Sequence, residues 1–184
     1  MATEKKQKWL EEGFTILSEE GAASLTIETL TGRLKVTKGA FYHHFKSWQE
    51  YKESLLSLYE KERTLNTIEF AEQQLSPLDK FEYVMEKSVR RNQNLEVAVR
   101  AWALIEPFVQ SYQQRIDQRR IDYLEEMMFL LYRDRERART MALIFYSLHV
   151  GSQQLIPPVK EKDLVKLYRE VQKAFNIQAS IKDE

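Results

Sequence analysis

The chain has 184 residues, no cysteine, and 28 Lys plus Arg residues against 28 Asp plus Glu residues, so its formal net charge is zero. This length suffices for one compact unit, or for a small module fused to a larger one. The lack of cysteine excludes disulfides and thiolate metal sites, and the balanced charge gives no general reason to expect a nucleic-acid or acidic-membrane partner.

Neither a signal peptide nor a membrane span is expected. The N-terminus lacks the apolar core of a signal peptide. The longest nearly apolar run, MALIFYSLHV, is about half of the roughly 20 residues that cross a bilayer. We therefore expect a soluble, cytoplasmic protein with no membrane partner.

Apolar residues recur at helical spacing along nearly the whole chain, whereas alternating β-branched strands and Asn-Gly hairpin turns are missing. This pattern predicts an all-α protein. In the first part of the chain, helices are expected over residues 4–20, 26–34, 37–44 and 48–66. Further helices are expected over about residues 77–92, 95–106, 107–132, 134–154 and 160–176. Gly21 is expected to end the first helix in a left-handed conformation, and Pro107 either breaks or kinks the chain.

The segments 26–34 and 37–44 are two short helices joined by a tight turn, and these dimensions are typical of a helix-turn-helix. Between residues 31 and 46 the sequence has four Lys or Arg side chains and no acid, so positive charge is concentrated there. The small side chains of Gly39 and Ala40 would let the second helix lie close to the floor of a DNA major groove. The residues predicted to face away from the apolar seam are Lys38, Gly39, Tyr42, His43 and Lys46.

The aromatic residues and histidines of this segment have alternative explanations. Phe41 and Phe45 are expected to be core residues, since aromatic side chains dominate core burial. Tyr42 fits a core position or a phosphate contact through its hydroxyl, and we favour DNA contact. A metal pair is the alternative for His43 and His44. Because neighbouring residues on a helix point about 100° apart and no third ligand lies nearby, no metal site is expected.

The run LTIETLTGRLKVTKGAFYHHFKSWQEY resembles the DNA-binding segment of TetR/AcrR-type transcriptional regulators. The shared pattern is a Thr-capped helix, a Val-Ser/Thr-Lys-Gly turn into a short recognition helix, a Tyr-x-x-Phe ending and a fourth helix that leads to a ligand-binding body. The resemblance covers about residues 8–58. It implies an N-terminal three-helix helix-turn-helix domain (residues 1–47), joined by a long fourth helix to a C-terminal helical ligand-binding and dimerisation domain (residues 48–184).

By this resemblance, eight residues contact double-stranded DNA: Thr26, Thr37, Lys38, Gly39, Tyr42, His43, His44 and Lys46. Thr26 and Thr37 would bind the DNA backbone from the starts of their helices, and His44 and Lys46 would lie beside phosphates. Three residues depart from the family pattern: Lys35 stands where Gly is usual, Thr31 where Ala is usual, and Trp48 where Lys is frequent.

The body of the chain gives no sign of an enzyme. It has no Gly-rich phosphate loop, no nucleophile elbow, no Glu-x-x-His ligand pair and no cysteine. We therefore expect no catalytic residue, no cofactor and no metal. His149 is either a buried, hydrogen-bonded residue or a ligand contact.

Aromatic and Met side chains are frequent in the body and serve either as core or as the walls of a pocket. Apolar walls with a few polar tips are typical of small-molecule pockets, and the resemblance places a pocket among the middle helices. The residues predicted to bind an effector are Trp102, Tyr123, Phe145, Tyr146 and His149.

A single recognition helix this short reads too few base pairs to find a genomic site, so two copies are expected on half-sites about one helical turn apart. Ser147 and Gly151 lie four residues apart on one helix face and would let a partner helix approach closely. The predicted homodimer interface consists of Ser147, Leu148, Gly151, Leu155, Leu164, Leu167, Val171 and Phe175. The alternative is that these residues only close the core of the monomer.

These features predict a sequence-specific DNA-binding transcriptional regulator, a repressor that binds a palindromic operator as a homodimer and dissociates when a small, mostly apolar ligand binds. The fourth helix would carry the effect of the ligand to the DNA as a near-rigid rod. The alternative is a DNA-binding or adaptor protein without a small-molecule ligand.

Overall fold

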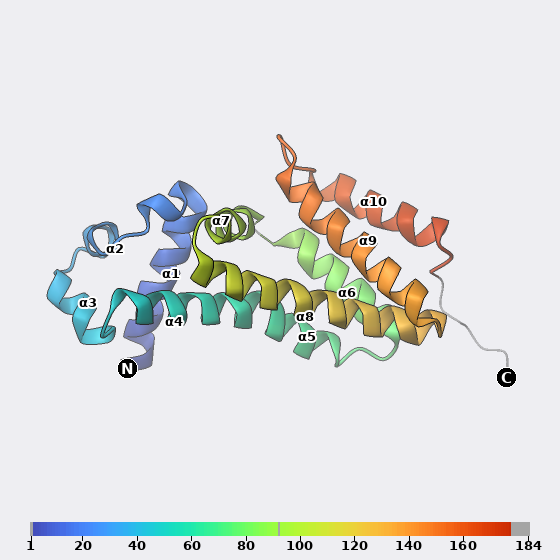
Figure 1. Cartoon of the computed structure of the whole chain (residues 1–184), viewed down its shortest axis with the longest axis horizontal. Helices are drawn as coiled ribbons and strands as arrows, with labels where there is room; N and C mark the ends of the chain where they lie inside the picture. Colours follow the sequence, from blue (N-terminus) through green and yellow to red (C-terminus); the bar gives the residue numbers. More distant parts are fainter. Residues whose placement is uncertain (1, 92, 178–184) are drawn as a thin grey trace. The chain divides into compact units, whose positions relative to one another are not determined.

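The computed structural model describes residues 2–91 and 93–177, which form helices, turns and loops without a β-strand (Figure 1). The predicted all-α fold class is therefore confirmed. No helix of the described residues is both long and apolar enough to cross a membrane. The chain forms two compact units. One is built from the chain up to Arg63 and the segment that ends at Arg115, and the other from Thr64–Arg91 and the chain from Ile116 onward.

The first unit combines the N-terminal helices with helices from the middle of the chain. It contains α1 (Ala2–Glu20), a 3-10 helix (Ala22–Ser24), α2 (Ile27–Leu34), α3 (Lys38–His44), α4 (Trp48–Glu60), α7 (Gln93–Ala103) and the beginning of α8 (Pro107–Tyr132). Because α7 packs on α1, this unit includes more of the chain than the predicted domain of residues 1–47. That functional division stays a prediction.

Aromatic side chains form much of the core of the first unit. Phe41, Phe45 and Tyr51 have no exposed surface. The ring of Trp9 meets those of Phe41 and Phe45 edge-on, with centroid distances of 5.5 and 6.5 Å. The Tyr51 hydroxyl donates to the backbone carbonyl of Trp9 at 3.0 Å and so joins α4 to α1. The predicted core positions of Phe41 and Phe45 are confirmed.

The second unit contains α5 (Asn66–Ala71), α6 (Pro77–Arg90), the rest of α8, α9 (Arg135–Gln154) and α10 (Glu161–Ala174). Its core is built from apolar side chains of α6, α8, α9 and α10. Phe81 of α6 and Phe145 of α9 are fully buried there and meet edge-on with ring centroids 4.8 Å apart. Helices with one apolar stripe bury it against one another, which explains why the four pack together.

Side-chain caps confirm the expected helix starts. The hydroxyls of Thr26, Thr37, Ser47 and Ser76 each accept from the backbone N–H three residues later, at 3.1 to 3.3 Å. Asp134 caps α9 in the same way, at 3.1 Å. Each cap satisfies one of the N–H groups that a helix start leaves without a partner, so these starts are fixed by local sequence.

The predicted helix over residues 48–66 is present, but it is not one uninterrupted rod. α4 ends at Glu60, a π-helical segment follows from Lys61 to Leu65, and α5 continues from Asn66 to Ala71. α4 and α5 are therefore joined through a π-helical segment, a feature that is frequent at functional sites in helices, and the transmission of a ligand effect along this path stays a prediction.

The helical segment is interrupted before Pro107, so the first of the two expected effects of this proline is observed. α7 ends at Ala103 and α8 begins at Pro107 itself, where the missing N–H of proline costs no hydrogen bond. The side chain of Glu106, just before the break, accepts from the indole N–H of Trp102 at 2.7 Å and forms an ion pair with Lys52.

Candidate nucleic-acid interface

The turn between α2 and α3 sets the geometry of the helix-turn-helix. Lys35 has left-handed backbone angles, φ 55° and ψ 45°. Its amide donates to the carbonyl of Gly32 at 3.2 Å, and the amide of Val36 donates to the carbonyl of Thr31 at 3.0 Å, which closes the end of α2. A Cβ costs about 1–2 kcal/mol in this conformation. Lys35 therefore keeps the turn that glycine usually makes, at an energetic cost.

Packing accounts for the other two departures from the usual pattern. Thr31 is buried, and its hydroxyl donates to the carbonyls of Ile27 at 2.8 Å and Glu28 at 3.0 Å, so the added polar group has partners. The ring of Trp48 stacks on that of Tyr51 with centroids 5.0 Å apart and an interplanar angle of 18°. Trp48 therefore packs on the core at the start of α4.

α3 presents four of the predicted DNA contacts on its exposed side. Lys38, Gly39, Tyr42 and His43 are all exposed, Tyr42 to 55%. The ring of Tyr42 meets the buried ring of Phe41 edge-on at a centroid distance of 5.4 Å. The exposed ring of Tyr42 thus rests on the core.

The other four predicted contacts lie at the ends of the same helices. Thr26 and Thr37 are the N-caps of α2 and α3. His44 is half-buried, with its ring centroid 6.1 Å from that of Trp9, and Lys46 is exposed beyond the end of α3. All eight residues therefore lie on the helix-turn-helix, and their contacts to DNA stay predictions.

Acids outside the basic segment neutralise part of its charge. Arg33 forms ion pairs with Glu19, Glu20 and Glu12 of α1. The hydrogen bonds that Arg33 donates to Glu19, Glu20 and Glu12, in that order of importance, raise the pKa of Arg33 above its usual range. These acids precede Arg33 by 13 to 21 residues, so the acid-free run in the sequence did not reveal them. Arg33 is held by α1 and is not a candidate for DNA contact.

Lys38 pairs with Glu28 of α2. The hydrogen bond between them raises the pKa of Lys38 and lowers that of Glu28. Both side chains are more than half exposed, at 59% and 65%, so solvent screens the pair and Lys38 can exchange Glu28 for DNA. Among the described residues Lys35 and Lys46 form no ion pair, which leaves both free for phosphates.

Gly39→Ala is expected to separate stability from DNA binding. A Cβ at Gly39 would have only the Thr37 hydroxyl within 4 Å, at 3.6 Å, so α3 accommodates it. Helix stability should rise by about 0.5–1 kcal/mol, whereas the methyl group would hinder close approach to a major groove. Urea unfolding and fluorescence anisotropy with a specific duplex measure the two effects. Undiminished DNA affinity would contradict the placement of Gly39 at the DNA.

The five predicted ligand-binding residues belong to different units. Trp102 lies on α7 in the first unit, whereas Tyr123, Phe145, Tyr146 and His149 lie on α8 and α9 in the second. Phe145 is fully buried, and Trp102, Tyr146 and His149 are at most 8% exposed. A role in binding a ligand stays a prediction for all five.

His149 is buried and hydrogen-bonded, the first of its two expected roles. The amide nitrogen of Gln153 lies 3.0 Å from Nε2 of His149, and the Tyr168 hydroxyl lies 3.2 Å from Nδ1. The Tyr146 hydroxyl likewise has a partner, since it donates to Asp117 at 2.6 Å. These hydrogen bonds satisfy polar groups inside an otherwise apolar core.

One residue of the predicted dimer interface is corrected by the structure. Leu164 has no exposed surface, because it packs in the core of its own chain, so it cannot contact a partner. The remaining seven residues keep exposed or partly exposed surface: Ser147, Leu148, Gly151, Leu155, Leu167, Val171 and Phe175. Their role in a dimer stays a prediction.

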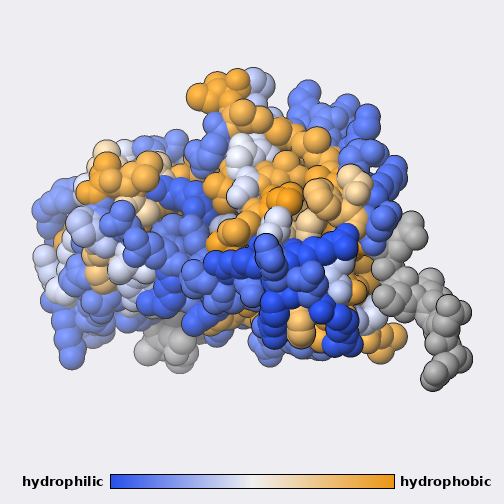
Figure 2. Space-filling model, turned by 45° about the vertical axis from the view of Figure 1, so that its right-hand side comes forward, coloured by the Kyte–Doolittle hydropathy of each residue, from blue (hydrophilic) through white to orange (hydrophobic). Residues whose placement is uncertain are grey.

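The surface of the second unit carries further apolar side chains that the sequence did not single out. Leu143 is 41% exposed and lies four residues before Ser147 on α9. The loop between α9 and α10 exposes Ile156 to 99%, next to Leu155 of the predicted dimer interface at 58%. Figure 2 shows this loop as an apolar projection at the top of the view.

Comparisons with known proteins agree with this geometry. Residues 10–56 match the family described as bacterial regulatory proteins, tetR family. No curated protein sequence matches the chain.

Solved structures of other proteins share the fold, and three examples follow. A TetR/AcrR-type regulator from Aquifex aeolicus VF5 has a TM-score of 0.74 and 20% identity, over 92% of this chain and 98% of that one. Escherichia coli NemR in its reduced form has a TM-score of 0.75 and 16% identity, over 91% and 96%. A regulator from Saccharomonospora viridis in complex with choline has a TM-score of 0.73 and 11% identity, over 93% and 96%.

Proposed function

Because the chain carries the DNA-binding domain of the tetR family of bacterial regulatory proteins, we propose that it is a cytoplasmic, sequence-specific transcriptional repressor. It binds a palindromic operator as a homodimer and leaves it when a small, mostly apolar effector binds. The observation that carries this proposal is the exposed side of α3, where Lys38, Gly39, Tyr42 and His43 lie together above an aromatic core. A short helix with small and hydrogen-bonding side chains suits a DNA major groove.

Selection of bound duplexes from a random DNA pool tests the proposal directly. We expect a palindrome whose half-site centres lie about one helical turn, roughly 34–36 Å, apart. Two copies of α3 related by a two-fold axis would require this symmetry. A selected site without symmetry, or no enrichment at all, would argue against a dimeric operator-binding protein.

We expect Gly151→Glu to abolish the dimer without unfolding the chain. A Cβ at Gly151 has no atom within 4 Å, so the monomer accommodates a side chain there. In a dimer joined through α9 and α10, the same side chain would enter the closest helix–helix approach as an uncompensated charge. Light scattering should change from twice 21.9 kDa to 21.9 kDa.

The exposed residue Gln73, in the loop before α6, offers a matched control. Gln73→Glu adds the same charge outside α9 and α10 and should leave the dimer intact. A parent chain that scatters as a 21.9 kDa monomer, even with DNA, would reject the homodimer.

Two observations support an effector. The similar structure from Saccharomonospora viridis is a complex with choline. In this chain a continuous helical path runs from Trp48 to Ala71, and it begins in the first unit and ends in the second. A helical path that belongs to both units would carry a change in the unit that binds the effector to the unit that carries α3. A coupling of about 1–3 kcal/mol would change DNA affinity by about 5- to 150-fold, and DNA would weaken the effector by the same factor.

Titration with hydrophobic compounds, followed by Trp fluorescence and operator binding together, separates the repressor from a DNA-binding or adaptor protein without an effector. Trp9, Trp48 and Trp102 all lie in the first unit, so their emission reports changes in the unit that carries α3. A compound with equal affinity for the free and the operator-bound protein would favour the protein without an effector.

A further inference from the structure

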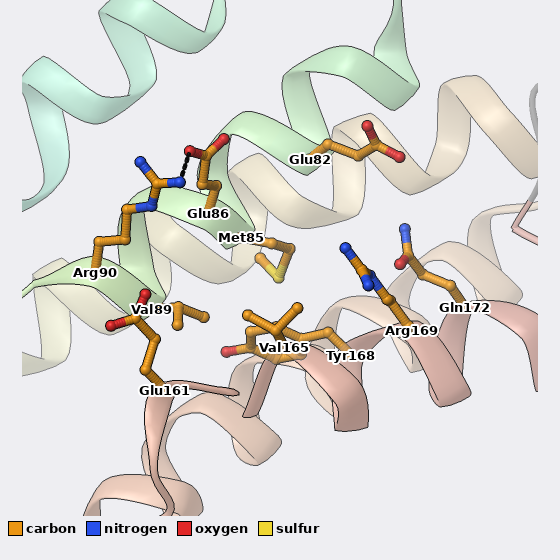
Figure 3. Close-up of a pocket in the computed structure, with 10 residues that line it drawn as sticks. All are labelled: Glu82, Met85, Glu86, Val89, Arg90, Glu161, Val165, Tyr168, Arg169 and Gln172. Carbon is orange, nitrogen blue, oxygen red and sulfur yellow. Dashed lines mark ion pairs between the residues drawn. The ribbon is translucent and has the colours of Figure 1, made fainter. Parts of the chain in front are cut away.

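A groove in the second unit lies between α6 and α10 (Figure 3). Its volume is about 430 Å³, within the range of roughly 300–1,000 Å³ that is usual for small-molecule sites. None of the five residues predicted to bind an effector lines it.

The groove has an apolar floor. Met85 and Val89 of α6 and Tyr168 of α10 are each at most 9% exposed, and the half-buried Val165 lies beside them. The Tyr168 hydroxyl lies 3.2 Å from Nδ1 of the buried His149, so this polar group is already engaged within the core. The floor therefore offers aliphatic carbon, a thioether and an aromatic ring to a ligand, a combination that favours an aromatic or bulky aliphatic group.

One end of the groove carries opposite charges on its two sides. Glu82 comes from α6 and Arg169 from α10, and Figure 3 shows both side chains beside the opening, with the amide of Gln172 next to Arg169. Neither Glu82 nor Arg169 forms an ion pair within the part of the chain that the structure describes. An acid and a base that face one opening without pairing can each bind a group of opposite charge on a ligand.

The other charged side chains that line the groove do not neutralise Glu82 or Arg169. Arg90 is already paired with Glu86 at 2.9 Å, one turn away on α6. Glu161 lies at the first residue of α10, eight residues before Arg169, which corresponds to about 12 Å along a helix. Glu82 and Arg169 are therefore the charges that a small ligand at this end would meet.

We propose that the groove binds an apolar α-amino acid, whose ammonium group pairs with Glu82, whose carboxylate pairs with Arg169 and whose side chain lies on Met85 and Val165. An α-amino acid carries both charges on one carbon, so a single molecule satisfies both protein groups at once. Gln172 supplies an additional hydrogen-bond donor for the carboxylate. A ligand with one charge would leave the opposite protein group without a partner.

Isothermal titration with L-phenylalanine, in the absence of DNA, tests the proposal. L-Phenylalanine should bind saturably, and phenethylamine and 3-phenylpropionate, which lack one charge each, should bind about fivefold more weakly or worse. Because no DNA is present, failure of this experiment leaves the proposed repressor function untouched, and success does not depend on it.

Two variants test which charge of the ligand each protein side chain binds. Glu82→Gln should reduce the affinity for L-phenylalanine and leave that for 3-phenylpropionate unchanged or higher. Arg169→Gln should reduce the affinity for L-phenylalanine and leave that for phenethylamine unchanged or higher. Glu170→Gln and Lys166→Gln change exposed charges of α10 that do not line the groove, and both should bind like the parent.

Three results would overturn the proposal. The first is that L-phenylalanine shows no saturable binding up to roughly 10 mM. The second is that phenethylamine and L-phenylalanine bind equally well. The third is that both groove variants bind L-phenylalanine with the affinity of the parent. All the substituted side chains are exposed, so circular dichroism should show unchanged folding in each variant.

Discussion

Replacing Lys38 with alanine, or Tyr42 with phenylalanine, is expected to weaken binding to a specific duplex by about 5- to 150-fold. Both side chains are exposed on α3, and Tyr42 rests on the buried ring of Phe41. Loss of a direct contact to a base or phosphate should therefore reduce DNA affinity without loss of fold. The measurement is a gel-shift or anisotropy titration with a duplex obtained by selection, at several salt concentrations. Affinity should fall steeply with salt, because binding releases counterions from the phosphates.

Matched controls come from the second unit. Lys162→Ala removes an exposed lysine from the first turn of α10, and Tyr83→Phe removes a hydroxyl from the half-buried ring on α6. Both should bind DNA like the parent. If the Lys38 and Tyr42 variants also bind like the parent, α3 is not the recognition helix.

Glu28→Gln should act in the opposite direction. In the free protein Glu28 pairs with Lys38, and its carboxylate would lie near the phosphates of a duplex bound by α3. Removal of this negative charge releases Lys38 and reduces repulsion, so DNA affinity should rise a few-fold at low salt. In the Lys38→Ala background the gain should be smaller, because only the reduced repulsion remains and there is no Lys38 to release. A loss of affinity in Glu28→Gln would show that the pair itself positions Lys38.

Gly13→Ala is expected to reduce the free energy of unfolding by about 1–3 kcal/mol or more. A Cβ at Gly13 would lie 2.0 Å from the Tyr51 hydroxyl oxygen and 3.2 Å from a Leu55 methyl carbon. Tyr51 cannot readily move aside, because it is fully buried, donates to the carbonyl of Trp9 and stacks on Trp48. Urea denaturation followed by Trp fluorescence measures the loss.

The second variant in this test uses the same substitution at an open position. A Cβ at Gly32 in α2 has no atom within 4 Å, so Gly32→Ala should raise stability by up to about 1 kcal/mol. In the Tyr51→Phe background the clash with Gly13→Ala is largely removed, so the cost of that substitution should shrink. Equal effects of Gly13→Ala and Gly32→Ala would contradict the close contact between α1 and α4.

The sequence alone determined those features whose cause lies within a few residues. Thr26, Thr37 and Ser47 cap their helices through the backbone N–H three positions later, so each helix start could be predicted from a short window. Gly21 has the expected positive φ, 81°, after the end of α1, but its ψ of 179° differs from that of the left-handed helical conformation. The helix-turn-helix and the all-α class followed from such local signals and from apolar spacing.

Only the tertiary structure decided which charges and surfaces are available, because these depend on segments far apart in the sequence. Arg33 and Lys38 belong to one basic run, yet α1 neutralises the first and α2 pairs the second. Leu164 and Leu167 lie one turn apart on α10 and look alike in the sequence. The packing of α10 buries the first completely and leaves the second 41% exposed.

The groove between α6 and α10 is the clearest case of a feature that only the tertiary structure decides. Glu82 and Arg169 are 87 positions apart in the sequence, and no spacing rule connects them. They face one opening because two amphipathic helices bury their apolar stripes against the same core, which fixes how the polar edges of the helices meet. Local hydrogen bonds thus set where each helix begins and ends, whereas the burial of apolar surface between distant helices set which side chains are brought together.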